Sequence, residues 1–251
     1  EAPQQRANAN RVLLTIDLTP AVCAEALNSP TAMIVSYHPP IFKPLSALTL
    51  SNPLQGSLLR CAAAGISIYT PHTALDSVIG GINDWLCLGV NNQLVPTRDA
   101  WRYIGEPNSE GLGGSGRMIK LSEPVSMQEL QRRIKSHLKL DHIQVAYTSA
   151  RDLTNVQSVA VCAGSGGSVL LGVDADVYFT GEMAHHEVLA AVASGHNVIL
   201  CGHTNTERGY LPVLAEKLVR ELSFDARSGT SEPPTLDVQV SKEDCHPLVI
   251  V

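Results

Sequence analysis

The chain has 251 residues, of which 44% are hydrophobic, and its formal net charge is -6 at pH 7. This length and apolar content allow a substantial core, in one large α/β domain or in two smaller ones. The acidic balance argues against a broad phosphate-binding surface, so we expect no direct contact with nucleic acid.

Cysteine usage and hydropathy indicate a cellular compartment. The cysteines are scattered without any C-x-x-C pair, which favours reduced, buried thiols over a disulfide framework or a zinc ribbon. The opening run EAPQQRANAN lacks the apolar core of a signal peptide, and no run approaches the ~20 apolar residues of a membrane span. We therefore expect no membrane contact and a location in the cytoplasm, extending to the nucleus.

Apolar runs and helical stretches alternate along the first part of the chain, which is typical of parallel βαβ units. Pro20 fits the first turn of a helix, and the pair Pro39 and Pro40 forces an extended loop after an apolar strand. We expect strands at residues 11–17, 31–38 and 65–70, and helices at residues 19–27, 53–64 and 80–89.

A polar, glycine-rich stretch at residues 105–116 is the best candidate for a boundary between two lobes, 11–104 and 117–251, of one domain over residues 1–251. Beyond it, Ser126 and Glu129 form a capping box before an amphipathic helix, whose basic residues we interpret as a solvated face. We expect strands at residues 118–121, 142–148, 156–164, 176–182, 197–203 and 236–240, and helices at residues 126–140, 187–194 and 212–222.

A weak internal repeat relates the two lobes. Residues 15–38 align without a gap with residues 180–203, matching a strand, an acid, a helix, a second strand and a terminal histidine. Few aligned positions are identical, so the argument rests on the element order and the ungapped length. Two such units would bring His38 and His203 to one site, at the carboxyl ends of the strands.

His203 and Glu207 form the first candidate pair of metal ligands. The apolar run VILC predicts a buried strand, and Gly202 lets the chain turn so that His203 follows the strand end. The spacing of the pair places imidazole and carboxylate on one side of a helical turn, about 5 to 6 Å apart at Cβ. The alternative is a capping box of Thr204 and Glu207, which needs no metal.

Further candidate ligands follow two other strands. Tyr37 and His38 end one strand, and His72 and Asp76, again one helical turn apart, follow another. Mixed nitrogen and oxygen ligands suit Zn, Fe or Mn, and a carboxylate can bridge two ions about 3.5 to 4 Å apart. Such ions lower the pKa of water to roughly 7, which indicates hydrolysis. The alternatives are a loop imidazole at His72 and a turn acid at Asp76.

Other polar positions have weaker interpretations. Residues 162–172 could form an anion-binding turn but lack the lysine of a P-loop, and a packing turn is the alternative. Adjacent helical residues point about 100° apart, so the three side chains of the run HHE at residues 185–187 cannot all chelate one ion. Asp17 and Glu182 are placed to orient a histidine ligand.

Several segments together resemble the Nif-three-like family, also labelled GTP cyclohydrolase I type 2. In the order of the family's motifs they are SYHPPIF, YTPHTALD with GGINDWL, GSGRMIKL, CAGSGG, TGEMAHHEVL and GHTNTERG. The resemblance implies a duplicated α/β/α fold, with two intertwined pseudo-symmetric halves around one metal site, and assembly into ring-shaped hexamers.

The resemblance also implies a site. Two divalent ions, Zn, Fe or Mn, would be held at the positions of His38, Asp76, His203 and Glu207. We expect Glu207 and His72 to serve catalysis. We expect Tyr37, Asp17 and Glu182 to contact the ligand side chains and not the metal itself.

Two features depart from the family pattern. Many members have a histidine where this chain has Tyr37, and a phenol, with a pKa of about 10, is a weaker ligand at neutral pH. Tyr37, together with the later NTERG, resembles the animal branch, which is associated with transcriptional corepression. The family's amino-terminal helix and strand have no counterpart before Arg11, so we expect an incomplete sheet edge beside Val12.

Two functions follow from these observations. The first is a metal-dependent hydrolase acting on an unknown small, nucleotide-like substrate, for which the cyclohydrolase label is an analogy. The second is an interaction protein that acts as a transcriptional corepressor and whose metal site is vestigial or structural.

Overall fold

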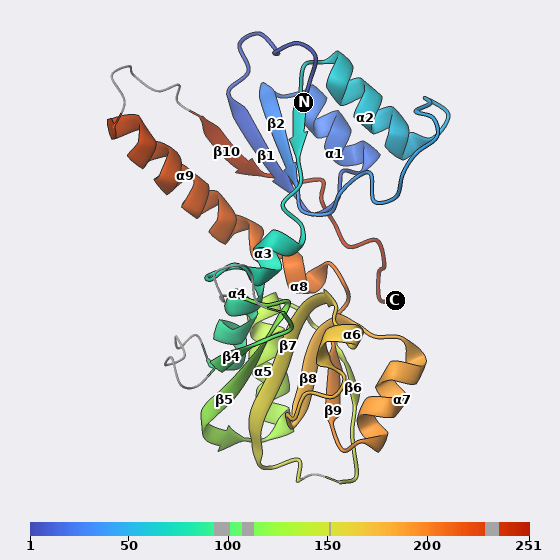
Figure 1. Ribbon diagram of the computed structural model, residues 1–251, viewed down its shortest axis with the longest axis vertical. Helices are drawn as coiled ribbons and strands as arrows, with labels where there is room; N and C mark the ends of the chain where they lie inside the picture. Colours follow the sequence, from blue (N-terminus) through green and yellow to red (C-terminus); the bar gives the residue numbers. More distant parts are fainter. Residues whose placement is uncertain (93–100, 107–112, 151, 229–235) are drawn as a thin grey trace. The chain divides into compact units, whose positions relative to one another are not determined.

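The computed structural model describes residues 1–92, 101–106, 113–150, 152–228 and 236–251, which form two compact units (Figure 1). The first unit contains Glu1–His72 and Tyr210–Val251, and the second contains Thr73–Gly209. In both units helices pack against a sheet, which confirms the predicted α/β class.

The first unit is built on a parallel sheet with the strand order β10-β1-β2-β3. Its strands are β1 Arg11–Thr15, β2 Thr31–Ser36, β3 Ser67–Tyr69 and β10 Asp237–Val240. The prediction of an incomplete edge beside Val12 is wrong, because Val12 pairs with Val238 of β10. The carboxyl-terminal strand therefore covers the side of β1 that we expected to be open.

Three described helices pack against this sheet: α1 Pro20–Leu27, α2 Pro53–Ala63 and α9 Leu211–Ser228. Thr19 caps α1 by accepting a hydrogen bond from the Val22 amide, and Asn52 caps α2 in the same way. α9 contacts β1 and β10 and continues beyond its predicted end. The core shared by α1, α2 and the sheet consists of Leu13, Leu18, Val22, Cys23, Ala26, Ile34, Cys61 and Ile66.

The second unit contains a mixed sheet with the strand order β4-β5-β7-β8-β9-β6. β7, β8 and β9 run parallel, whereas β4, β5 and β6 each pair antiparallel. The strands are β4 Trp101–Ile104, β5 Gly116–Val125, β6 Gln144–Ala146, β7 Val156–Ser165, β8 Val177–Glu182 and β9 Asn197–Leu200. β4 was not expected from the sequence, and it pairs with β5.

The helices of the second unit include short ones at the strand ends. The described helices of this unit are α3 Thr73–Ser77, α4 Ile82–Val90, α5 Met127–Leu138, α6 Gly167–Leu170, α7 His185–Ala193 and α8 Asn205–Arg208. Ser126 caps α5 by accepting from the Glu129 amide, which confirms the Ser126 half of the predicted capping box. The Glu129 carboxylate accepts from Arg132 and Arg133. Among the described helices, none combines the length and hydropathy needed to cross a bilayer.

The two compact units begin and end at different residues from the predicted lobes. Residues 105–116, where we expected a boundary, fall within the range of the second unit, and residues 107–112 lie outside the described residues. The first unit takes strands from both ends of the chain because β10 pairs with β1. One family domain over residues 1–251, with lobes at 11–104 and 117–251, stays a prediction.

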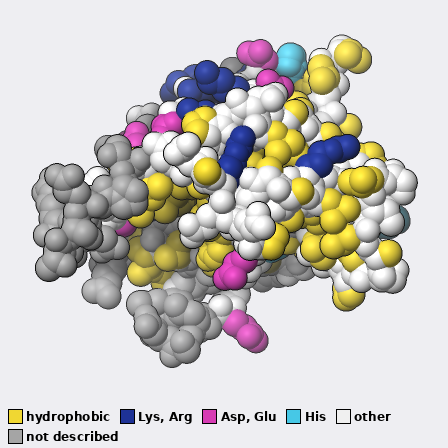
Figure 2. Space-filling view, turned by 90° about the horizontal axis from the view of Figure 1, so that it is seen from above, with side chains coloured by type: hydrophobic (Ala, Val, Ile, Leu, Met, Phe, Trp, Pro, Cys, Tyr) yellow, Lys and Arg dark blue, Asp and Glu magenta, His cyan; other side chains and the backbone are white. Residues whose placement is uncertain are grey.

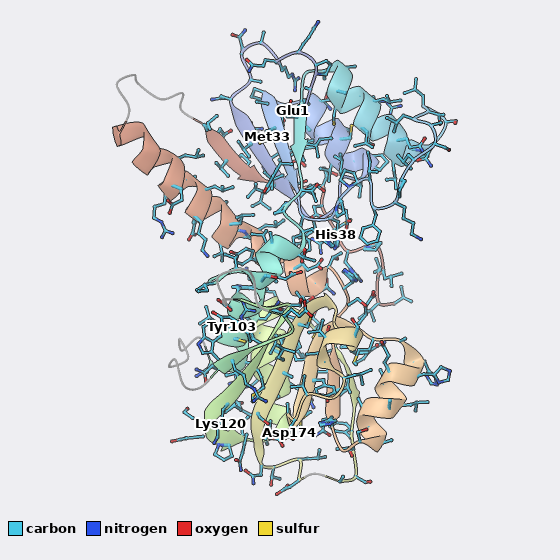
Figure 3. The ribbon with its side chains drawn as sticks, in the orientation of Figure 1. Glu1, Met33, His38, Tyr103, Lys120 and Asp174 are labelled. Carbon is cyan, nitrogen blue, oxygen red and sulfur yellow. The ribbon has the colours of Figure 1, made fainter. Side chains whose placement is uncertain are left out.

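Arg117, on β5, is a buried cation that joins several segments of the second unit. Its side chain is 0% exposed and forms an ion pair with Asp84 of α4. Its guanidinium also donates to the carbonyls of Ser77 and Val78 and lies 4.6 Å from the ring centroid of Tyr103, which Figure 3 labels. Burial of a charge is tolerated here because every partner is in place.

We expect Arg117→Leu to destabilise the second unit strongly, because Asp84 would remain as a buried charge without its partner. Losing one member of a buried pair typically costs about 3 to 5 kcal/mol, which would be measured as a lower urea midpoint. Arg132→Ala is the control, because Arg132 is 65% exposed in its pair with Glu129 and should leave the midpoint nearly unchanged. Equal midpoints for the two variants would contradict the structural role of Arg117.

Candidate metal centre

In the first unit, β2 carries His38 to the carboxyl ends of two parallel strands. The amides of Tyr37 and His38 donate to the carbonyls of Thr15 and Ile16, which continues the β1–β2 pairing past the end of β2. His38, labelled in Figure 3, has its Nδ1 atom 3.0 Å from Asp17 Oδ1. Because the carboxylate engages Nδ1, Nε2 is the ring nitrogen that a metal would take.

Tyr37 and His72 lie around His38 in the same unit. Their ring centroids are 5.0 and 5.8 Å from that of His38, and Tyr37 is buried. The His72 amide donates to the Tyr37 carbonyl, and His72 has a φ of +41°, which is uncommon for a residue other than glycine. The first unit therefore brings together four of the predicted site residues: Asp17, Tyr37, His38 and His72.

In the second unit, the turn after β9 carries His203 and Glu207. Gly202 has a φ of +87°, and its amide donates to the Gly181 carbonyl, so the chain turns beside the end of β8. His203 Nδ1 lies 2.9 Å from Glu182 Oε1, and His203 Nε2 lies 3.3 Å from Glu207 Oε1. The predicted spacing therefore does place imidazole and carboxylate side by side.

Glu207 does not form a capping box with Thr204. The Thr204 side chain makes no capping hydrogen bond to α8, and the Glu207 amide donates to the Thr204 carbonyl instead. The Glu207 side chain is only 2% exposed, and a buried carboxylate is unfavourable unless a partner compensates its charge. These contacts favour a ligand over a cap.

Glu207 and Glu182 stabilise the charged form of His203 in metal-free protein. The hydrogen bond with Glu207 is the main cause that raises the pKa of His203 from 6.5 to about 9, and Glu182 adds to it, against the effect of burial. A raised pKa stabilises the folded state fully below pH 6.5, and this stabilisation is lost as the pH rises through about 9.

Gly164, on β7, keeps space open beside this pair. It has a φ of +63°, and a Cβ added there would lie 2.6 Å from Glu207 Oε1 and 2.9 Å from His203 Nε2. The Gly164 amide donates to Thr206 Oγ1 at 2.9 Å, so the backbone is held in this position. Both candidate ligand atoms therefore face bare backbone, which only glycine provides.

Asp76 lies in α3 of the second unit, in the same region as Glu207. Burial raises the pKa of the Cys162 thiol to about 12, and the carboxylates of Asp76 and Glu207 both contribute to this rise. Within the second unit, His203 contacts both Glu182 and Glu207, whereas the Asp76 carboxylate lies outside the group of described ligand atoms that are within 4.8 Å of one another. His72, one turn before Asp76 in the sequence, belongs to the first unit.

The glycine-rich turn within residues 162–172 uses its amides internally. The Gly166 amide donates to Thr180 Oγ1, as the Gly164 amide does to Thr206. A Cβ on Gly167 would collide with the Glu187 carboxylate, so an acidic group already lies at the start of α6. These contacts favour a packing turn over an anion site.

Sequence reasoning missed two buried polar residues beside the candidate ligands. Thr206 holds the Gly164 amide, and Asn83 hydrogen-bonds both the Asp76 carbonyl and the Ala163 amide. Both residues are 0% exposed. Both residues lie within motifs of the family resemblance, Asn83 in GGINDWL and Thr206 in NTERG, and this marked them as candidates. Sequence spacing does not show which groups they bind.

Comparison with known proteins identifies related sequences. A model of the family described as Duf34/NIF3 (NGG1p interacting factor 3) matches residues 2–231. Protein NIF3 homolog of Schizosaccharomyces pombe is 46% identical, over 99% of this chain and 87% of its own length. NGG1-interacting factor 3 of Saccharomyces cerevisiae is 38% identical, over 96% and 81%. NIF3-like protein 1 of Drosophila melanogaster is 41% identical, over 96% and 82%.

A solved structure has the same fold. The Bacillus cereus protein related to NIF3 superimposes with a TM-score of 0.77 at 20% identity, over 97% of this chain and 90% of that chain. This likeness concerns the fold alone and confirms the predicted family fold. The fly relative, with the fungal ones, confirms the predicted resemblance to the animal branch.

We expect Gly164→Ala to separate Glu207 from His203, because the added methyl group would occupy the space beside both side chains. In metal-free protein, the pKa of His203 should then fall from about 9 toward 6.5, which NMR titration of the histidine rings would measure. Gly172→Ala is the matched control, because Gly172 also has a positive φ (+87°) but nothing within 4 Å of an added Cβ. An unchanged His203 titration in Gly164→Ala would refute the close approach.

Proposed function

The chain belongs to the Duf34/NIF3 family, and we propose that it is a metal-dependent hydrolase acting on a small, nucleotide-like substrate. In this proposal His38, Asp76, His203 and Glu207, the four positions that the family resemblance implies, supply ligand atoms for divalent metal. Zn, Fe and Mn are the metals that such mixed nitrogen and oxygen ligands suit.

The observation that carries the proposal is a repeated carboxylate–imidazole pair. Asp17 binds His38, and Glu182 binds His203, each through Nδ1 and each across 21 residues of sequence. In both cases the acid and the histidine lie at or just beyond the ends of neighbouring parallel strands. A carboxylate on the second ring nitrogen is the usual partner of a metal-ligating histidine, because it sets the tautomer and the ring orientation.

The residues also fit a divalent ion in size and chemistry. Imidazole nitrogen and carboxylate oxygen are the ligand types of zinc and related metals. Gly164 leaves the space beside His203 Nε2 and Glu207 Oε1 without a side chain.

The chain's own residues have separate roles in this chemistry. When bound, a divalent ion lowers the pKa of water to roughly 7 and so supplies a nucleophile at neutral pH. Asp17 and Glu182 orient the imidazoles of His38 and His203, and the buried carboxylate of Glu207 would serve as a ligand. His72, held to the Tyr37 carbonyl beside His38, exchanges a proton with the leaving group.

Family resemblance supports three further parts of the proposal. Each chain would hold two ions, the chains would assemble into ring-shaped homo-hexamers, and the protein would act in the cytoplasm and also in the nucleus. Tyr37 would weaken one of the two metal positions, because its phenol ionises only near pH 10.

Metal analysis and hydrolysis assays test the proposal together. We expect purified protein to bind Zn, Fe or Mn, and Glu182→Gln or Asp17→Asn to lower the metal affinity roughly 10- to 100-fold, as loss of an orienting carboxylate does. Turnover in a screen of nucleotides, GTP included, should fall to background in Glu207→Gln. Glu216→Gln, an exposed change on α9, is the control and should alter neither property. Wild-type protein that takes up none of these metals would contradict the proposal.

Contact with a transcriptional regulator is a second candidate function. The S. cerevisiae relative is named for its interaction with NGG1. In this chain the segment after His38 exposes Ile41, Phe42, Leu45, Leu48 and Leu50, each by 44 to 73%. Figure 2 shows hydrophobic side chains lying open on the face that it draws. Apolar surface of this kind is typical of protein interfaces.

Binding of purified NGG1 separates the two candidates. If the second function holds, Phe42→Ser combined with Leu50→Ser should abolish NGG1 binding in a pull-down assay, because the two substitutions would remove apolar contact with NGG1. His203→Ala should leave NGG1 binding unchanged while removing metal. Wild-type protein that fails to bind NGG1, or a surface variant that binds it equally well, would exclude this interface.

A further inference from the structure

Asn83, at the start of α4, makes hydrogen bonds to three backbone segments that are distant in sequence. Its Nδ2 atom donates to the carbonyls of Asp76 at 3.1 Å and Ser115 at 2.9 Å. Its Oδ1 atom accepts from the Ala163 amide at 2.9 Å. The side chain is 0% exposed, so these bonds replace water that it cannot reach.

These bonds join the backbone of one candidate ligand to the strand end beside two others. Asp76 is the acid of α3, and Ala163 directly precedes Gly164, against which His203 Nε2 and Glu207 Oε1 lie. All of these residues belong to the second unit. A shift of Asn83 would therefore move Asp76 relative to the His203–Glu207 pair.

α3 cannot hold this position by itself. It has five residues, and an isolated helix of this length is not stable. The segment that follows is held from outside: Arg117 binds the carbonyls of Ser77 and Val78. Asn83 is the described side chain whose bonds reach both the Asp76 carbonyl and the β7 end.

We propose that Asn83 is a positioning residue, which sets the placement of Asp76 against His203 and Glu207 and thereby the affinity for a divalent metal ion. The inference rests on the proposed metal site and assigns to this amide a role beyond filling the core. An asparagine that served only stability would affect folding and leave metal affinity unchanged.

The chain offers a matched control in Asn197. It is also 0% exposed and lies in the second unit, where its amide accepts from the Thr148 amide and donates to the Asp176 carbonyl. It lies at the start of β9, whereas His203 follows the end of that strand. Asn83→Ala and Asn197→Ala therefore each remove a buried amide, but only the first removes a bond to Asp76.

The test is titration of the full chain with Co²⁺, followed by the visible absorption of the bound ion, and melting of the metal-free protein. We expect Asn83→Ala to weaken Co²⁺ binding roughly 10- to 100-fold and to change the absorption bands, as loss of an orienting contact does. Asn197→Ala should lower the melting temperature and leave both the affinity and the bands as in wild type. If Asn83→Ala does not fold, Asn83→Asp, which keeps the oxygen that accepts from Ala163, should show the same weakening.

Each result decides a different point. Equal Co²⁺ affinity in wild type and the Asn83 variants overturns the positioning role while the proposed metal site stands. Equal weakening in Asn197→Ala also overturns it, because the effect would then be general loss of stability. Wild-type protein that binds no Co²⁺ overturns the metal site itself, and the positioning role with it.

Discussion

The orientation of two histidine rings is the constraint on which the candidate site depends. Backbone hydrogen bonds to the neighbouring strand segment hold His38 and hold Gly202, which directly precedes His203, and a carboxylate at the end of that neighbouring segment engages each Nδ1. Glu182 is the last residue of β8 and Asp17 follows the end of β1, so each acid lies where the first strand of a βαβ unit ends. The chemistry therefore follows from the topology, because a parallel strand pair brings the two residues to the same edge of the sheet.

Buried polar contacts give the second unit its precision near the candidate ligands. Asn83 and Thr206 accept hydrogen bonds from the successive amides of Ala163 and Gly164, and Arg117 holds the segment after Asp76. Short helices such as α3 and α8 have too few hydrogen bonds to be rigid alone. Buried donors and acceptors must be satisfied, so such contacts permit few alternative arrangements of these segments.

Several elements were predictable because their signals are local. The caps of Thr19 and Ser126 begin α1 and α5 where the sequence indicates, and apolar runs mark β2, β8 and β9. β4 was missed because a run of four residues is too short to establish an alternating pattern. The edge beside Val12 was wrongly expected to be open, because pairing between β1 and β10 joins opposite ends of the chain.

The sequence by itself determined that histidines follow the ends of apolar strands, that an acid precedes each by the same interval, and that Glu207 lies one helical turn after His203. These are properties of spacing, which the chain carries locally. The tertiary structure alone decided that Glu207 is buried against His203 instead of capping α8, that Gly164 lies against both, and that Asn83 connects Asp76 to Ala163. Contacts between residues tens of positions apart depend on how strands pair and helices pack, and no local periodicity records that.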